Sequence, residues 1–411
     1  MRQRRRAGGW LSSARWALGF VLAMSALYLA CWIFIAAPTR LLLPLGVGAP
    51  EVSAWLALGA IAAVALTIPD VRARRSPRFV LAGATLALIL ALTPLARFPF
   101  TARRMDAAMR AGLGDDPLRS VPPAARAQMR EHPLSAGDLF GGIALGEARV
   151  TRAITFGTVD GTQLRADVYR PLQSGSYPVV VQVYGGAWQR GNPDDNANFA
   201  HWLAARGYVV FALDYRHAPH AHWPAQLDDI RLGLAWIRDH AAQYDADTSR
   251  VALMGRSAGA QLALVAAYTS GPMRVRAVVS YYGPVDLLDA YQHPPHPDPL
   301  KIREVEETFL GGPPDGMLDA YRAASPISYA TRPQPPSLLV IGSRDHIVEA
   351  RYGRRLRDRL VASGTTAVLL EIPWADHAFD EVFNGPSSQL ALYHTERFLA
   401  WAMSTEHLVE P

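Results

Sequence analysis

A serine between two glycines is the feature of this chain with the clearest chemical meaning. Ser257 lies in the segment Gly255-Arg256-Ser257-Ala258-Gly259, between an apolar stretch typical of a buried strand and an alanine-rich stretch typical of a helix. Glycines on both sides allow the tight strand-to-helix turn that presents a nucleophilic hydroxyl at the end of a sheet. The helix N-terminus favours the negative charge that develops there. The pattern therefore predicts Ser257 as a nucleophile.

A serine hydroxyl is a weak nucleophile and needs an adjacent base. Asp345 ends the strand-like segment "PSLLVIGSRD", and His377 lies in the loop that follows "TAVLLEIP". The chain order Ser, acid, His is typical of hydrolases with this kind of turn. We expect His377 to take the proton from Ser257, and Asp345 to orient the imidazole.

Acyl transfer also needs hydrogen-bond donors for the oxygen that becomes negatively charged. The segment "PVVVQVYGGAWQRG" runs from a predicted strand into the small residues Gly185, Gly186 and Ala187. Small residues let main-chain N–H groups approach a substrate carbonyl, and the amide of Ala258 would complete the donor set. We further expect Tyr184, Gly185, Trp188 and Trp223 to contribute to a substrate pocket.

The elements that must position these residues alternate between strands and helices from about residue 150 onward. Two strands separated by "GTVDG" form a predicted hairpin, and the later strands are continuous apolar runs, as expected for strands covered on both faces. The expected strands are 149–156, 163–171, 178–186, 208–215, 250–257, 275–283, 336–345 and 366–373. This order predicts an α/β fold with one mostly parallel, doubly wound, eight-stranded sheet over residues 150–405.

Four motifs together make the region from about 150 to 405 resemble an α/β-hydrolase of the esterase/lipase group, related to hormone-sensitive lipase and to bacterial feruloyl and acetyl-xylan esterases. They are the Gly-Gly-x-Trp turn, "LDYRHAPHAHWPAQLDD" at 213–229, "GRSAG", and the loops that carry Asp345 and His377. The resemblance implies carboxylic-ester hydrolysis through an acyl-enzyme. It also implies oxyanion donors at Gly186, Ala187 and Ala258, and a lid insertion near 285–330.

One position departs from that family, which usually has a histidine where this chain has Tyr184. The form Gly-Gly-Ala-Trp is also similar to kynurenine formamidases and isoprenylcysteine methylesterases, so amidase or peptidase chemistry on the same scaffold stays open. A non-catalytic, membrane-tethered binding domain is the third alternative. In the signature segment, we expect Asp214 and Arg216 to form a structural ion pair. We do not expect its histidines to bind a metal.

Three uncharged apolar stretches, near 17–37, 52–69 and 79–96, predict transmembrane helices in the first hundred residues. Arginines lie before the first stretch and between the second and third, at Arg2, Arg4, Arg5, Arg6, Arg15, Arg72, Arg74, Arg75 and Arg78. The positive-inside rule then places the N-terminus in the cytoplasm and the catalytic region outside it. If the second stretch does not cross, that region returns to the cytoplasm. Residues 101–149 are expected to form a connector, with a partial cap as one interpretation.

Charge and composition exclude several other classes. The first 110 residues hold 14 basic and 3 acidic residues, whereas the remainder holds 27 basic and 33 acidic ones. The basic balance therefore belongs to the membrane-type segment, and we expect no nucleic-acid binding. The single cysteine, Cys31, excludes an intrachain disulfide. We expect no metal or organic cofactor, and a small-molecule or lipid ester as substrate, while the oligomeric state stays open.

Overall fold

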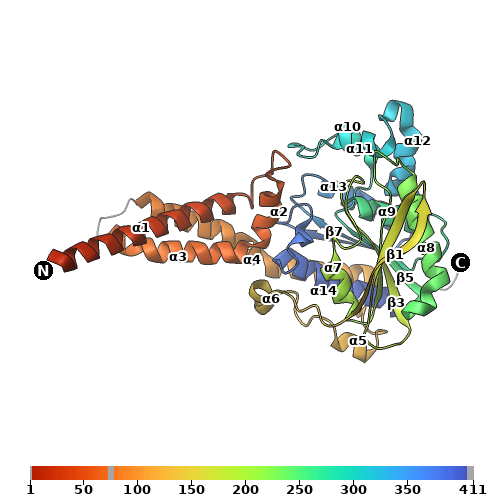
Figure 1. Ribbon diagram of the computed structural model, residues 1–411, viewed down its shortest axis with the longest axis horizontal. Coiled ribbons are helices and arrows are strands. Elements are labelled where there is room, and N and C mark those ends of the chain that lie inside the picture. The colour runs from red at the N-terminus through yellow and green to blue at the C-terminus, as the bar shows by residue number, and fades with distance from the viewer. Residues whose placement is uncertain (1, 73–77, 405–411) are drawn as a thin grey trace.

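An eight-stranded sheet forms the centre of the C-terminal region in the computed structural model, which describes residues 2–72 and 78–404 (Figure 1). The strands follow the order β1-β2-β4-β3-β5-β6-β7-β8. β1 and β2 pair antiparallel, as do β2 and β4, and every later pairing is parallel. The strands are β1 (Arg149–Val159), β2 (Thr162–Arg170), β3 (Tyr177–Val183), β4 (Val209–Leu213), β5 (Ala246–Arg256), β6 (Ala277–Tyr281), β7 (Ser337–Gly342) and β8 (Ala367–Ile372). The predicted mostly parallel sheet is confirmed.

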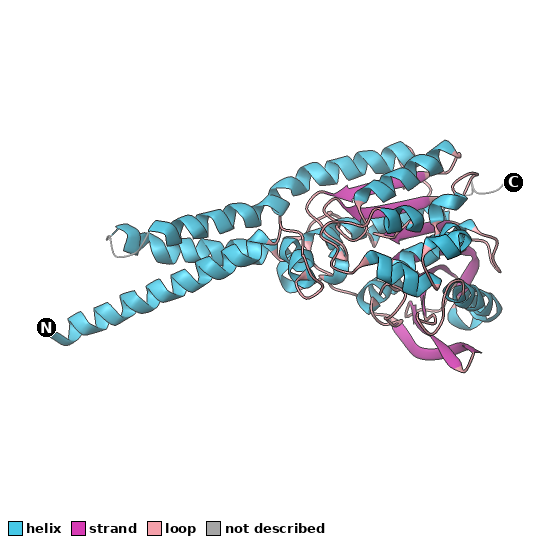
Figure 2. Cartoon of the chain, turned by 90° about the horizontal axis from the view of Figure 1, so that it is seen from above, coloured by secondary structure: helices cyan, strands magenta, loops and turns pink. Residues whose placement is uncertain are grey.

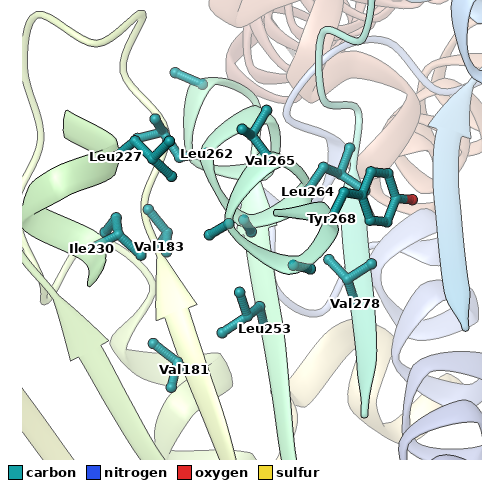
Figure 3. Close-up of a cluster of buried hydrophobic side chains, with 14 of the residues drawn as sticks. Val181, Val183, Leu227, Ile230, Leu253, Leu262, Leu264, Val265, Tyr268 and Val278 are labelled. Carbon is teal, nitrogen blue, oxygen red and sulfur yellow. The ribbon is translucent and has the colours of Figure 1, made fainter. Parts of the chain in front are cut away.

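Helices cover both faces of this sheet, as its continuous apolar strands require. They include α7 (Ala197–Ala204), α8 (Ala225–His240), α9 (Ala258–Tyr268), α13 (Ala350–Ala362) and α14 (Pro386–Ser404). On one face, side chains of α8, α9 and α13 pack against strand residues such as Val181 and Leu253 (Figure 3). On the other face, α7 and α14 pack against strand residues such as Val180 and Met254. Burying each such side chain contributes about 1.5–3 kcal/mol, so the strand ends that carry the site are held firmly.

Three helices lie between β6 and β7, where the sequence places a lid insertion. They are α10 (Leu287–Gln292), α11 (Ile302–Leu310) and α12 (Pro314–Ala324). Phe309 and Leu310 of α11 are fully buried in the same core cluster as α9. This insertion is therefore packed against the α/β core, and its action as a lid stays a prediction.

The N-terminal region is a bundle of three long helices, α1 (Arg2–Cys31), α3 (Ser53–Arg72) and α4 (Arg78–Leu113). The bundle extends away from the sheet (Figures 1 and 2), and the short helix α2 (Leu43–Glu51) lies between α1 and α3 in the chain. Alanines such as Ala30, Ala60 and Ala87 fill the contacts between these helices, whereas large apolar side chains such as Val21 and Ile89 are more than half exposed. Small residues inside and large apolar residues outside are typical of helices that pack within lipid.

By length and composition, two helices of the described residues could cross a membrane, and α2 with α3 could form a third span bent by 79°. The helical boundaries differ from the predicted ones. The first helix ends at Cys31 instead of 37, and the third continues without interruption from Arg78 to Leu113. The predicted orientation depends in part on Arg74 and Arg75, which lie outside the described residues.

The C-terminal part of α4 joins the bundle to the sheet, so the expected boundary at residue 100 falls within one helix. Gly112 lies against the sheet: a Cβ there would be 2.6 Å from Val368 Cγ2. Nearer the middle of the helix, the ring of Phe98 lies 6.0 Å from that of Trp374. The remaining part of the predicted connector contains two short helices, α5 (Pro123–Ala127) and α6 (Ala136–Gly141).

Candidate active site

Ser257 lies in a sharp turn between β5, which ends at Arg256, and α9, which begins at Ala258. Its backbone has φ +50° and ψ −123°, a conformation that costs a non-glycine residue about 1–3 kcal/mol. The flanking glycines make the turn possible. A Cβ at Gly255 would lie 2.2 Å from the Gly259 carbonyl oxygen, and one at Gly259 would lie 2.2 Å from that of Tyr184.

Ser257, His377 and Asp345 form a continuous chain of hydrogen bonds. The Ser257 Oγ lies 2.9 Å from His377 Nε2, and His377 Nδ1 lies 2.8 Å from Asp345 Oδ2. Asp345 Oδ1 accepts hydrogen bonds from the N–H groups of Ile347 and Val348, which fix the orientation of the carboxylate. The structure therefore brings together three side chains from widely separated segments, in the arrangement expected of a nucleophile, a base and an orienting acid.

A second Asp–His pair lies directly beside these three residues, and sequence reasoning missed it. Asp376 Oδ1 accepts a hydrogen bond from the His377 N–H at 2.7 Å and lies 2.9 Å from Nδ1 of His346. Burial lowers the pKa of His346, but its bond to Asp376 outweighs this effect, so the pKa is raised overall. The pair connects the loop of Asp345 to the loop of His377. Each member adjoins a predicted site residue in sequence, which was the available signal.

Below the nucleophile, a buried ionic cluster supports the turn. Arg256 Nε donates to Asp380, and the Tyr282 hydroxyl donates to the same carboxylate. The Arg256 guanidinium lies 4.6 Å from the Phe199 ring centroid, and the Tyr282 ring lies 4.7 Å from the imidazole of His377. Because a buried charge must be paired, the arginine within "GRSAG" could have signalled a buried acidic partner, but not which one.

The predicted oxyanion donors lie in two turns that meet at Ser257. Gly186 and Ala187 follow β3 with φ values of +129° and +55°, and Ala258 is the first residue of α9. A Cβ at Gly186 would lie 2.1 Å from the Arg190 carbonyl oxygen, so only glycine fits there. Within the described residues, the N–H groups of Gly186, Ala187 and Ala258 donate no hydrogen bond to the protein. These donors are therefore free to bind a substrate oxygen.

Tyr184 stands where the family that the sequence resembles usually has a histidine, and it packs under the turn that carries the predicted oxyanion donors. Its hydroxyl donates to Asp214 Oδ1 at 2.6 Å and lies 2.9 Å from His217 Nε2. Its ring stacks on Tyr215 at 4.5 Å. Burial, with the nearby Tyr215 and Asp214, raises the pKa of Tyr184 far above its usual range, so the hydroxyl keeps its proton.

The predicted ion pair between Asp214 and Arg216 is wrong. Asp214 accepts from the Tyr184 hydroxyl, whereas Arg216 pairs with Asp229 at 2.9 Å and with Asp160 at 2.6 Å. Burial leaves the carboxylate of Asp229 on α8 in need of a cationic partner, and Arg216 supplies it, while Asp214 is taken up by the Tyr184 hydroxyl. Both residues have structural partners, and neither lies in a cavity beside Ser257.

Two cavities meet at Ser257. We call the first, of about 50 Å³, the apolar pocket; its lining includes Trp188, Ala258, Val285 and Val305. We call the second, of about 480 Å³, the polar cleft; its lining includes Gly185, Arg190, Asn192, Asp195, His377, Glu381 and Leu43 of α2. Of the four predicted pocket residues, Trp188 and Gly185 line these cavities. Tyr184 and Trp223 line neither; Trp223 packs on Phe309, behind the ring of Trp188.

The histidines of the signature segment lie among protein partners. His217 contacts Tyr184, and Nδ1 of His222 lies 2.9 Å from the carbonyl oxygen of Thr308. Within residues 2–72 and 78–404, no group of three His, Cys, Asp or Glu side chains could hold a metal ion.

Known proteins resemble this chain over the same region. Residues 166–360 match the BD-FAE family model. A probable carboxylic ester hydrolase of Mycobacterium tuberculosis, LipM, is 32% identical over 248 residues, which are 57% of this chain and 56% of LipM. Esterase LipC of the same organism is 33% identical, over 56% of this chain and 60% of LipC. The matches thus span less than two thirds of either relative.

A solved esterase of the archaeon Pyrobaculum calidifontis superimposes with a TM-score of 0.55 at 23% identity, over 63% of this chain and 84% of the esterase. At this identity the likeness concerns the fold. The sheet region therefore shares the fold of this solved esterase. The predicted fold class is therefore confirmed for residues 150–404, while the comparisons say nothing of the N-terminal bundle.

Proposed function

We propose that this chain is a serine hydrolase that cleaves carboxylic esters, with Ser257 as nucleophile, His377 as base and Asp345 as the acid that orients it. The observation that carries the proposal is the unbroken hydrogen-bond chain from Ser257 Oγ through His377 to Asp345, at the meeting point of two cavities. The matches to a probable ester hydrolase, to an esterase and to the BD-FAE model support the same chemistry.

The reaction proceeds in two halves. Ser257 Oγ attacks the ester carbonyl carbon, and its proton moves to His377 Nε2, while Asp345 stabilises the resulting imidazolium through Nδ1–H. The carbonyl oxygen takes up the negative charge beside the N–H groups of Gly186, Ala187 and Ala258. The tetrahedral intermediate then collapses, and the leaving alcohol oxygen takes the proton from Nε2. In the second half, water gives a proton to Nε2 and attacks the acyl carbon. The bond between that carbon and Ser257 Oγ then breaks, Oγ takes the proton back from Nε2, and the acid leaves.

The two cavities then receive different parts of the substrate. The leaving oxygen must lie near the protonated His377 Nε2, and His377 lines the polar cleft but not the apolar pocket. The alcohol part therefore occupies the polar cleft, and the acyl part occupies the apolar pocket. A volume of about 50 Å³ fits a short acyl group.

We further propose that α1, α3 and α4 anchor the chain in a membrane, with the N-terminus in the cytoplasm and the α/β region outside it. Large apolar side chains on the outer face of the bundle and alanines at its helix contacts support this arrangement. A reporter that fluoresces only in the cytoplasm, fused to the C-terminus, tests the orientation. We expect no fluorescence, and a strong signal would contradict the proposed side.

Hydrolysis of p-nitrophenyl butyrate by the full-length chain in detergent tests the catalytic proposal. Ser257→Ala should lower kcat by about 10³-fold or more, because the variant still folds but has lost the nucleophile. The control is Ser270→Ala, at an exposed serine, which should leave kcat unchanged. Butyranilide, an amide with the same acyl group, should be cleaved far more slowly. Retained ester hydrolysis in Ser257→Ala would overturn the assignment, and equal turnover of the amide would overturn the ester preference.

A further inference from the structure

The apolar pocket contains one buried carboxyl that the proposed reaction does not use. Glu306 lies on α11, is 2% exposed, and lines the pocket together with Ser257 and the apolar side chains of Ile302 and Val305. Its Oε2 is buried without a hydrogen-bond partner among the described residues. A buried polar atom without a partner costs free energy that a leucine at the same position would not.

The other polar side chains that line the pocket are all occupied. Trp188 Nε1 donates to Gln261 at 2.9 Å, and the Tyr352 hydroxyl accepts from Arg351 at 2.8 Å. Asp286 accepts from the Asp289 N–H and pairs with Arg355 at 3.1 Å. The Ser257 hydroxyl is hydrogen-bonded to His377. Glu306 thus differs from these neighbours, because it lines the pocket with a carboxyl oxygen that is bonded to no described residue.

The protonation state of Glu306 determines what it can recognise. Burial raises the pKa of this carboxyl well above its usual range, and the negative charges of Asp286 and Asp298 raise it further. A neutral carboxyl offers one O–H donor within an otherwise apolar wall. Its natural partner is an uncharged oxygen atom, which accepts a hydrogen bond and brings no charge into the pocket.

We infer that Glu306 is a specificity-determining residue that donates a hydrogen bond to an oxygen on the acyl chain, so that the preferred substrates are esters of short hydroxy, alkoxy or keto acids. The inference rests on the proposed ester hydrolysis and on the acyl group occupying the apolar pocket. A plain alkyl chain would fill the same space and leave the carboxyl unpartnered, which discriminates against it.

Two esters of nearly equal size test this directly. In p-nitrophenyl methoxyacetate, an oxygen replaces one methylene group of p-nitrophenyl butyrate. The measured quantity is the ratio of kcat/KM for the methoxyacetate to that for the butyrate, and each variant is compared with the wild-type chain. This comparison cancels the intrinsic difference in reactivity between the two esters.

Glu306→Leu should lower this ratio by about 10- to 100-fold, because the donor is lost and the wall becomes fully apolar. Glu306→Gln keeps an N–H donor and should stay within about threefold of wild type. The control is Glu304→Leu, two residues away on the exposed side of α11, which should not change the ratio.

An unchanged or increased ratio in Glu306→Leu, with both esters still hydrolysed, would overturn the role of Glu306 alone. A ratio that falls equally in Glu306→Gln would also overturn it, because the loss would then not follow the donor. If the wild-type chain hydrolyses neither ester, the proposed function fails and this inference fails with it.

Discussion

The two cavities beside Ser257 differ in chemistry and in the part of the chain that builds them. The apolar pocket is lined only by residues of the α/β region, largely from the loops after its strands and from α10 and α11. The polar cleft is larger, carries charged side chains, and includes Leu43 from the N-terminal segment. The proposed acyl side therefore belongs to the α/β region alone, whereas the proposed alcohol side also includes Leu43 of the N-terminal region.

This N-terminal segment does more than touch the cleft. Glu51 at the end of α2 accepts hydrogen bonds from the N–H and hydroxyl of Ser387, and the Ser387 hydroxyl accepts from the Trp374 indole at 2.9 Å. Arg344 donates to the carbonyl oxygen of Phe34. Trp374 and Arg344 belong to the loops that carry His377 and Asp345. The difference between the cavities shows that the N-terminal region contacts the loops of the candidate site, in addition to the membrane anchoring that we propose for it.

The largest expected effect does not distinguish the two cavities. Asp345→Asn should lower kcat by about 10⁴-fold for every ester, because the imidazole loses its orienting carboxylate. Steady-state hydrolysis of p-nitrophenyl acetate and butyrate measures this effect. Asp319→Asn, at a fully exposed aspartate, is the control. A loss of kcat for only one of the two esters would show that Asp345 affects how the acyl group binds, and not the orientation of His377.

Removing bulk from the apolar pocket should change acyl-chain preference. Val285→Ala should raise kcat/KM for p-nitrophenyl hexanoate relative to butyrate by about 10-fold, because one or two methylene groups in an apolar pocket change the barrier by about 1–3 kcal/mol. Val361→Ala, at an exposed valine, should not change the preference. If Val285→Ala instead alters preference among alcohol groups, the assignment of the two sides is reversed.

A change in α2 should affect the preference for the alcohol part of the ester and not the preference for the acyl part. Leu43→Ala should alter kcat/KM for esters with bulky alcohols by about three- to tenfold, and leave acyl-chain preference unchanged, since Leu43 lines only the cleft. Butyrate esters of ethanol and of cyclohexylmethanol provide the comparison. Leu41→Ala, at a neighbouring leucine that is 87% exposed, is the matched control. No difference between these two variants would remove α2 from the substrate site.

The smallest effect concerns the stability of the apolar side. Because the folded-state pKa of Glu306 is raised above its unfolded value, this residue destabilises the fold increasingly as pH rises from about 4.5 toward the folded pKa. Glu306→Gln should therefore gain stability relative to wild type as pH rises, by at most about 1.4 kcal/mol per pH unit. Thermal unfolding in one detergent from pH 4 to 8 measures this. If the midpoints of wild type and Glu306→Gln change with pH in parallel, Glu306 is not buried as a neutral acid.

Much of the α/β region could be predicted because its signals are local. A hairpin signal predicts the first two strands, apolar runs predict the other six, and glycine spacing predicts the turn that carries Ser257. Asp345 and His377 could be chosen because each follows a strand, and the structure brings them to Ser257, while their catalytic role stays a prediction. The helix of residues 78–113 was predicted as a shorter span, because its continuation past residue 96 is amphipathic and reads as a separate element.

The features that sequence reasoning missed depend on contacts between distant segments. The bond between Glu51 and Ser387 joins positions 336 residues apart, and no periodicity indicates it. Tyr184 departs from the histidine of the family that the sequence resembles, but nothing in the sequence indicates that its hydroxyl bonds to Asp214 while Arg216 pairs with Asp229. Glu306 reads as an ordinary charge on an amphipathic helix, and only packing shows that it faces a cavity.

Labelling of the full-length chain with a fluorophosphonate, followed by mass spectrometry of the peptides, tests most directly whether Ser257 is the reactive nucleophile. We expect one adduct, on Ser257, that is absent in Ser257→Ala and forms much more slowly in His377→Ala. An adduct on a different serine would contradict the proposed mechanism. Undiminished ester hydrolysis by Ser257→Ala would contradict it as well.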